Sequence, residues 1–196
     1  MSVLLIAGSP TARSRSAALL DAVALRLSVQ GIRSERLSVR DVAPEALVLA
    51  QFDHPAIVAA SAQVEKAQVV VVATPVYKAA YSGVLKAFLD LLPQTALKGK
   101  TVLPLATGGS PHHMLALDYA LRPVLQSLGA KHILPGIYAN DAQVTLSPEG
   151  AYTVHPDIGA RLDDAAHILL SETLRPAHWA AGSFAPVDFS QVRCSV

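Results

Sequence analysis

The feature of this sequence that most constrains its fold is a serine-rich turn at residues 7–16, which lies between an apolar run and a helical pattern. The run Val3–Ile6 is continuously apolar, which is typical of a strand buried on both faces of a parallel sheet. From Ala17 onward, apolar residues recur at helical spacing as far as Gly31, where a helix C-cap is expected. The chain is therefore predicted to begin with a strand, a turn and a helix.

This turn has the composition of a phosphate-binding loop. It offers hydroxyl groups at the start of a helix, where the first N–H groups have no internal partner and the helix dipole favours an anion. The candidate phosphate ligands are Ser9, Thr11, Ser14, Arg15 and Ser16. The same residues also suit an ordinary strand-to-helix loop with a serine N-cap, so the turn alone leaves both interpretations open.

Strands and helices alternate along the rest of the chain. Strands are predicted at 3–7, 32–39, 68–74, 101–107 and 131–139, and helices from about 17 and at 56–67, 84–92, 114–128 and 158–174. Alternation of this kind indicates a parallel sheet with helices on both faces. Five such strands with an anion-binding turn after the first predict an α/β fold, a flavodoxin-like doubly wound five-stranded sheet of order 2-1-3-4-5.

Three prolines qualify this pattern. Pro75 is expected to end the strand at 68–74, and Pro104 argues for a sheet edge or a bulge because proline removes a ladder donor. Pro123 predicts a kink or an irregular turn in the helix at 114–128.

Composition limits the class of protein. The length of 196 residues and the hydrophobic fraction of 52% predict one domain at 1–175, followed by a C-terminal tail at 176–196. A net charge of +1 offers no electrostatic footprint for nucleic acid or for an anionic membrane. No apolar run reaches the roughly 20 residues of a membrane span, and a single cysteine, Cys194, excludes an internal disulfide. We therefore expect a soluble cytoplasmic protein.

A metal site is not expected. The adjacent residues His112 and His113 point apart in a loop, and no third clustered ligand accompanies them.

Two further loops follow the third and fourth predicted strands. Carboxyl ends of parallel strands meet at one edge of the sheet, and ligands bind there where the strand order reverses. The candidate ligands are Pro75, Val76 and Tyr77 in the second loop, and Thr107, Gly108, Gly109 and Ser110 in the third. The second loop supplies an aromatic ring, and the glycines of the third let a flat ring approach the backbone. A phosphate at one end and a planar ring at the other describe a mononucleotide such as FMN.

Other nucleotide classes lack support in the sequence. It contains neither Gly-x-Gly-x-x-Gly nor a Walker-type Gly-Lys-Ser/Thr, which argues against a dinucleotide Rossmann site and against an NTPase.

The three loops carry a resemblance to a known family. Residues 8–16, 74–86 and 107–110 resemble the flavin loops of the NAD(P)H-dependent FMN reductases, and the resemblance covers residues 3 to about 140. Residues 112–125 resemble most closely the reductase component of two-component alkanesulfonate monooxygenases. One departure is Thr11, which stands where the family often has arginine, and Arg13 could supply that charge from a shifted position.

The resemblance implies a flavodoxin-like fold and a function. FMN would bind as a substrate, NADPH would donate the hydride, and a partner monooxygenase for alkanesulfonate desulfonation would receive the reduced flavin. The protein would form a homodimer or a homotetramer. Tyr119 matches a tyrosine inserted in a helix of this subgroup, where a π-type bulge with a role in flavin access or at a subunit interface is expected. No other catalytic side chain is required, because the flavin carries the chemistry.

Two other functions remain open at this point. One is an FMN-retaining NAD(P)H quinone or azo reductase, and the other is a flavodoxin-like electron carrier without NADPH activity. Flavodoxins are usually strongly acidic, so the near-neutral charge weighs against the carrier.

Overall fold

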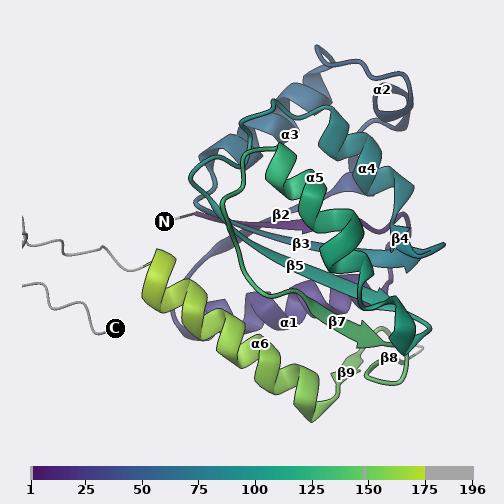
Figure 1. Cartoon of the computed structure of the whole chain (residues 1–196), viewed down its shortest axis with the longest axis vertical. Coiled ribbons are helices and arrows are strands. Elements are labelled where there is room, and N and C mark those ends of the chain that lie inside the picture. Colours follow the sequence, from purple (N-terminus) through teal and green to yellow (C-terminus); the bar gives the residue numbers. More distant parts are fainter. Residues whose placement is uncertain (1, 148, 175–196) are drawn as a thin grey trace, which may run out of the picture.

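A parallel sheet runs through the middle of the molecule (Figure 1). The computed structural model describes residues 2–147 and 149–174, so the predicted tail at 176–196 lies outside the described residues. The parallel strands are β1 (Val3–Ala7), β2 (Ser34–Ser38), β3 (Val69–Tyr77), β5 (Thr101–Gly108), β6 (His132–Ile133) and β7 (Ile137–Asn140). Their order is β2-β1-β3-β5, followed by β6 and β7 on the far side of β5, which confirms the flavodoxin-like fold.

The sheet differs from the prediction in two details. The fifth strand is divided into β6 and β7, because Pro135 and Gly136 interrupt it and Gly136 lies so close to Leu117 that an added Cβ would be 2.8 Å from that side chain. In addition, a short strand β4 (Ala80–Tyr81) pairs antiparallel with the end of β3.

The prediction that Pro75 ends its strand was wrong, and Pro104 also lies inside a central strand. The N–H of Val69 points toward β1, so alternate residues of β3 do the same. The N–H of Gly8 continues this ladder to the Ala73 carbonyl, so residue 75 faces the Gly8 carbonyl, which accepts from the Ser82 hydroxyl. Pro104 faces the other neighbour of β5, at the gap between β6 and β7. The Leu134 carbonyl beside Pro104 accepts from Arg122 at 3.3 Å. Each proline thus lies opposite a carbonyl that a side chain satisfies, so the missing N–H leaves no acceptor unpaired.

Helices cover both faces of the sheet (Figure 1). One layer consists of α1 (Arg15–Val29) and α6 (Pro156–Ile168), and the other of α2 (Pro44–Val48), α3 (Pro55–Lys66), α4 (Gly83–Asp90) and α5 (Arg122–Ser127). Alternate residues of β1 divide between the two cores, since Leu4 and Ile6 pack in one cluster and Leu5 in the other. The sheet is therefore apolar on both faces, as its continuous hydrophobic runs predict.

The helix around Tyr119 contains the predicted bulge. Residues Leu117–Leu121 form a π turn that leads directly into α5, which confirms the expectation based on Tyr119. Pro123 lies in the first turn of α5, where a missing N–H is tolerated. A second π turn, Leu169–Thr173, follows α6 and was not expected.

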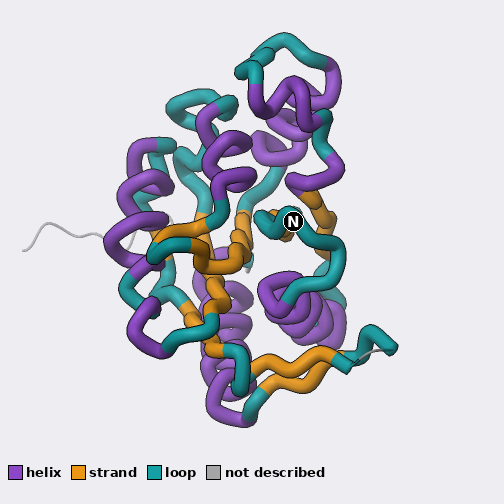
Figure 2. The backbone as a smooth tube through the Cα atoms, turned by 90° about the vertical axis from the view of Figure 1, so that its right-hand side faces the viewer, coloured by secondary structure: helices purple, strands orange, loops and turns teal. Residues whose placement is uncertain are grey.

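A hairpin of β8 (Val144–Leu146) and β9 (Tyr152–Val154) lies beside the start of α1. Figure 2 looks onto the carboxyl edge of the sheet and shows the hairpin in its lower part, with helices on both sides of the strands. This edge is where the three predicted ligand loops meet.

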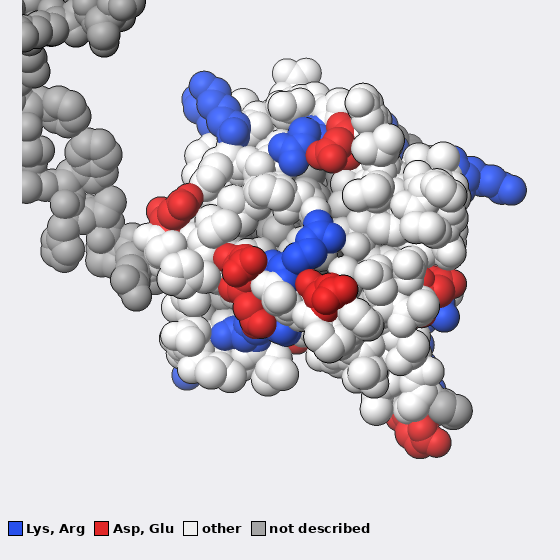
Figure 3. Space-filling model, turned by 60° about the horizontal axis from the view of Figure 1, so that its bottom comes forward, with Lys and Arg blue, Asp and Glu red and all other residues white. Residues whose placement is uncertain are grey.

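Charges of both signs are interspersed on the face drawn in Figure 3. Oppositely charged side chains also pair between elements, as Arg26 of α1 does with Asp163 of α6, whose Nε and Oδ1 atoms are 2.6 Å apart. Among the described helices, none is long and apolar enough to cross a membrane.

Candidate functional site

The first loop presents its hydroxyl groups around the start of α1. Ser14 is the N-cap of this helix, and its Oγ accepts a hydrogen bond from the N–H of Ala17 at 3.1 Å and lies 3.1 Å from Ser16 Oγ. Ser9 Oγ accepts from the N–H of Thr11 at 3.2 Å, and the Thr11 hydroxyl donates to the Arg13 carbonyl at 3.2 Å. The loop is thus held in one conformation before any ligand binds, with its hydroxyls near the positive end of the helix dipole.

Arg15 lies at the same helix start but is turned toward the next chain segment. Its Nε donates to the Val144 carbonyl at 3.0 Å, and one terminal nitrogen lies 3.5 Å from Asp141 Oδ1. The guanidinium therefore fixes the β8 end against α1, and it carries further donors for an anion because these contacts use two of its nitrogens.

Hydrogen bonds join the first loop to the second. The N–H of Gly8 donates to the Ala73 carbonyl at 2.8 Å, and the Ser82 hydroxyl donates to the Gly8 carbonyl. An added Cβ at Gly8 would lie 3.0 Å from both the Ala73 oxygen and Leu85, so glycine permits this close approach. The two loops consequently hold a fixed spacing.

The second loop ends in a tight hairpin between β3 and β4. Lys78 and Ala79 at its tip both have positive φ, 49° and 64°, which is the geometry of a type I′ turn and is unusual for residues other than glycine, asparagine and aspartate. This turn places Tyr77 at the edge of the site with its side chain exposed.

The third loop is positioned by a tyrosine that the sequence prediction missed. Tyr138 of β7 donates a hydrogen bond from its hydroxyl to the Ser110 carbonyl, and an added Cβ at Gly108 would lie 2.6 Å from that hydroxyl oxygen. Position 108 therefore requires glycine because the Tyr138 hydroxyl occupies the space of a side chain. Gly109, in contrast, is exposed, and an added Cβ there would lie 3.7 Å from Asp141 Oδ2, an ordinary contact distance. Gly109 leaves its backbone open to a flat ligand.

Burial raises the pKa of Tyr138, and the nearby Asp141 carboxylate raises it further. The phenol consequently stays protonated at neutral pH and keeps its hydrogen bond to the third loop. Only the strand register identifies this residue. Tyr138 pairs with Ala106, two residues before Gly108, and from there its aromatic side chain packs against the glycine.

Strand register brings the three loops together. Ala7 pairs with Ala73, and Pro75 pairs with Thr107, so β1, β3 and β5 end side by side. All twelve residues proposed from sequence to bind the flavin lie in the last residues of these strands or in the segments that follow them. The π turn packs beside β4 and β5 at the same edge, and Tyr119 on it is 79% exposed.

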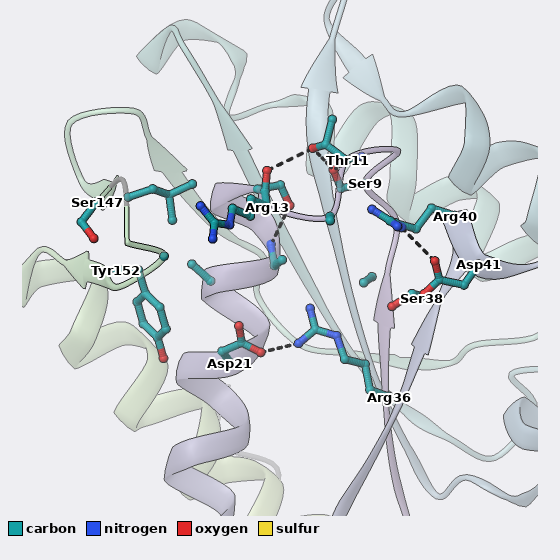
Figure 4. A pocket seen from close by; sticks show the side chains of 17 residues that line it. Ser9, Thr11, Arg13, Asp21, Arg36, Ser38, Arg40, Asp41, Ser147 and Tyr152 are labelled. Carbon is teal, nitrogen blue, oxygen red and sulfur yellow. Dashed lines mark hydrogen bonds and ion pairs between the residues drawn. The ribbon is translucent and has the colours of Figure 1, made fainter.

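A cavity of about 390 Å³ adjoins the first loop (Figure 4). It includes Ser9, Thr11 and Ser14, but it extends toward the end of β2 and the β8–β9 hairpin. The arginines on its β2 side, Arg36 and Arg40, are functional candidates that the sequence analysis did not identify. Within the described part of the chain, no group of three or more His, Cys, Asp or Glu side chains is arranged to hold a metal ion.

Comparison with known proteins decides the family. The family model for NADPH-dependent FMN reductase matches residues 1–145, which is most of the chain. The chain belongs to this family. Its class is therefore that of an oxidoreductase, and the cofactors of the family are FMN and NADPH.

Relatives of this FMN reductase share much of their length with it. It is 47% identical over 165 residues to the FMN reductase (NADPH) of Escherichia coli, covering 84% of this chain and 86% of the relative. It is 41% identical over 196 residues to the FMN reductase (NADPH) of Pseudomonas putida, covering 92% and 100%. The NADH-dependent FMN reductase SfnF of Pseudomonas fluorescens is 35% identical over 156 residues, covering 76% and 83%.

A solved structure has the same fold. The apo form of NADH:FMN oxidoreductase (EMOB) superposes with a TM-score of 0.78 at 40% identity, covering 89% of this chain and 91% of that chain. Proteins named for NADPH and for NADH thus both resemble this FMN reductase.

The residues present fit FMN. Buried Ser9 and Ser16 place hydroxyls at a helix start for a phosphate, and the exposed backbone of Gly109 leaves room for a ring at the other end.

Proposed function

We propose that this FMN reductase takes a hydride from NADPH and passes it to FMN, which enters and leaves as a substrate. The observation that carries the proposal is the hydrogen-bonded connection of the loops after β1 and β3, beside the loop after β5, at one edge of the sheet. The residues proposed to hold the phosphate are Ser9, Thr11, Ser14, Arg15 and Ser16. Those proposed to hold the ring are Pro75, Val76, Tyr77, Thr107, Gly108, Gly109 and Ser110.

The chemistry resides in the two nucleotides. NADPH gives up a hydride, hence two electrons, to the flavin ring, NADP⁺ leaves, and the reduced flavin takes any further proton from water. The protein would bind the phosphate at the start of α1 and the ring beside the exposed backbone of Gly109, and in this way bring the flavin and the nicotinamide together. No side chain of the site needs to act as acid, base or nucleophile.

Delivery of reduced flavin to a partner monooxygenase is the second part of the proposal. Its support is the resemblance of residues 112–125 to reductase components of alkanesulfonate monooxygenases. The expected role is to supply reduced flavin in the cytoplasm to a partner that desulfonates alkanesulfonates for sulfur acquisition. Met114, Leu115 and Tyr119 are large exposed side chains of this segment. Exposed apolar groups close together favour a protein interface, and we propose that they join subunits of a homodimer or homotetramer and that Tyr119 affects flavin access.

Flavin content and turnover test this proposal. We expect a colourless purified protein whose NADPH oxidation depends on added FMN and saturates with it. A yellow protein that reduces quinones or azo dyes without added FMN would instead indicate a flavin-retaining reductase. Bound FMN that NADPH fails to bleach would indicate an electron carrier.

A further inference from the structure

The cavity beside the first loop lies on the α1 face of the sheet, at the carboxyl end of β2 (Figure 4). On this face β1 contributes apolar residues, but the β2 residues paired with them are polar, since Leu5 pairs with Arg36 and Ala7 pairs with Ser38. On α1, the small side chains of Ala17 and Ala18 line the cavity. This part of β2 therefore faces an open cavity where a helix would otherwise pack.

One side of the cavity carries guanidinium groups. Arg36 is ion-paired with Asp21 of α1, and Arg40 Nε lies 2.8 Å from Asp41 Oδ1. These arginine side chains are 37% and 39% exposed. Each of these ion pairs uses one nitrogen of a group that has five N–H donors in a planar fork, so both arginines retain donors for a phosphate monoester.

The opposite side is apolar and comes from the hairpin. Leu146 and Tyr152 are cross-strand partners in β8 and β9, both line the cavity, and both are partly exposed. A flat aliphatic and aromatic surface suits a nucleobase. The Asp21 carboxylate lies between this surface and Arg36, and a carboxylate accepts hydrogen bonds from sugar hydroxyls (Figure 4).

The cavity thus combines an apolar surface for a base, a carboxylate for sugar hydroxyls and two guanidinium groups for a phosphate. These are the groups that a phosphorylated nucleoside requires. We propose that this cavity binds the adenosine 2′-phosphate half of NADPH, and that Arg36 and Arg40 contact the 2′-phosphate and set the preference for NADPH over NADH. The inference rests on the proposed function, in which NADPH is the hydride donor. Ser9 and Thr11 line this cavity and also belong to the proposed flavin phosphate loop, so the two nucleotides would lie next to each other at the first loop.

Substitution of the two arginines tests the inference. In Arg36→Gln, in Arg40→Gln and in the double variant, the ratio of kcat/KM for NADPH to kcat/KM for NADH should fall, by about tenfold or more for each lost guanidinium–phosphate contact. The matched control is Arg33→Gln, which removes an exposed arginine just before β2, at the end of the strand away from the cavity, and should leave the ratio within about twofold.

A binding measurement separates this inference from the proposed function. Wild-type protein without FMN should bind 2′,5′-ADP more tightly than 5′-ADP in calorimetry, and Arg36→Gln should lose that difference while keeping the thermal midpoint of the control. If this pattern appears but NADPH reduces no FMN, the proposed function fails and the cavity still binds the phosphorylated nucleoside.

Other outcomes would overturn the inference. An unchanged NADPH to NADH ratio in the folded double variant would do so, as would equal binding of the two ADP isomers by the wild type. A raised KM for FMN with an unchanged donor ratio would assign the arginines to the flavin phosphate.

Discussion

Replacement of Gly108 by alanine should destabilise the protein mainly through a clash with the Tyr138 hydroxyl. The new Cβ would lie 2.6 Å from the Tyr138 hydroxyl oxygen and 3.3 Å from Val76 Cβ, both inside ordinary contact distance. Overpacking of a buried site costs about 1–3 kcal/mol, and displacement of the tyrosine hydroxyl from Ser110 adds about 1 kcal/mol. For a chain of this size the thermal midpoint should fall by roughly 4–16 °C.

The matched rescue is the double variant with Tyr138→Phe, because phenylalanine lacks the clashing oxygen. Urea unfolding of the wild type, both single variants and the double variant should show that the second substitution recovers much of the loss caused by Gly108→Ala. The reasoning is refuted if Gly108→Ala unfolds like the wild type, or if Tyr138→Phe adds its own cost to that of the alanine.

Four further outcomes follow from the site. Ser82→Ala removes both the hydrogen bond to Gly8 and the N-cap of α4, so chemical unfolding should show a loss of about 1–3 kcal/mol, and an unchanged midpoint would contradict the connection of the loops. Ser14→Ala removes the N-cap of α1, so stability should fall by about 1 kcal/mol, and the KM for FMN should also rise. A loss of stability with an unchanged KM would mean that Ser14 caps the helix and does not bind the flavin phosphate. The pKa of Tyr138 is raised in the folded state, so the stability that its protonated phenol contributes should be complete below about pH 10 and decrease as pH rises above it. In Tyr138→Phe the free energy of unfolding should therefore depend less on pH in that range, as measured by chemical unfolding at several pH values. Tyr119→Ala should alter flavin turnover or oligomer size by sedimentation, and no change in either would refute its proposed role.

Much of the fold was predictable because hydrophobic runs and helical spacing repeat clearly along the chain. The runs at residues 3–7 and 101–107 identify central strands, since only a sheet covered on both faces buries every residue of a run. Pro75 misled the prediction because a proline is tolerated where the carbonyl opposite it bonds to another donor. Here that donor is the Ser82 hydroxyl, which bonds to the Gly8 carbonyl, and a contact across 74 residues is not visible in a linear sequence.

The ligand loops were predictable for a different reason. Ser14 and Ser16 lie at the start of a helix, and the glycines at 108 and 109 lie at the end of a buried strand, so local chemistry and topology together place them at one edge. The partner of Gly108, Tyr138, lies thirty residues away and becomes evident only from the register of β5 and β7.

The cavity at the end of β2 was not predictable in the same way. Arg36 alternates with Leu37 as expected for an edge strand with one solvent-facing side, and this pattern alone does not distinguish a solvated face from the wall of a cavity. The distinction depends on the β8–β9 hairpin, which comes more than a hundred residues later in the chain and forms the other wall.

Anaerobic reaction of the purified protein with NADPH and an excess of free FMN tests the central claim most directly. The account predicts that NADPH is oxidised and FMN reduced in equal amounts, far beyond the amount of protein present, and that NADPH is stable when FMN is omitted. Reduction that stops at one flavin per protein, or no reduction of FMN at all, would contradict it.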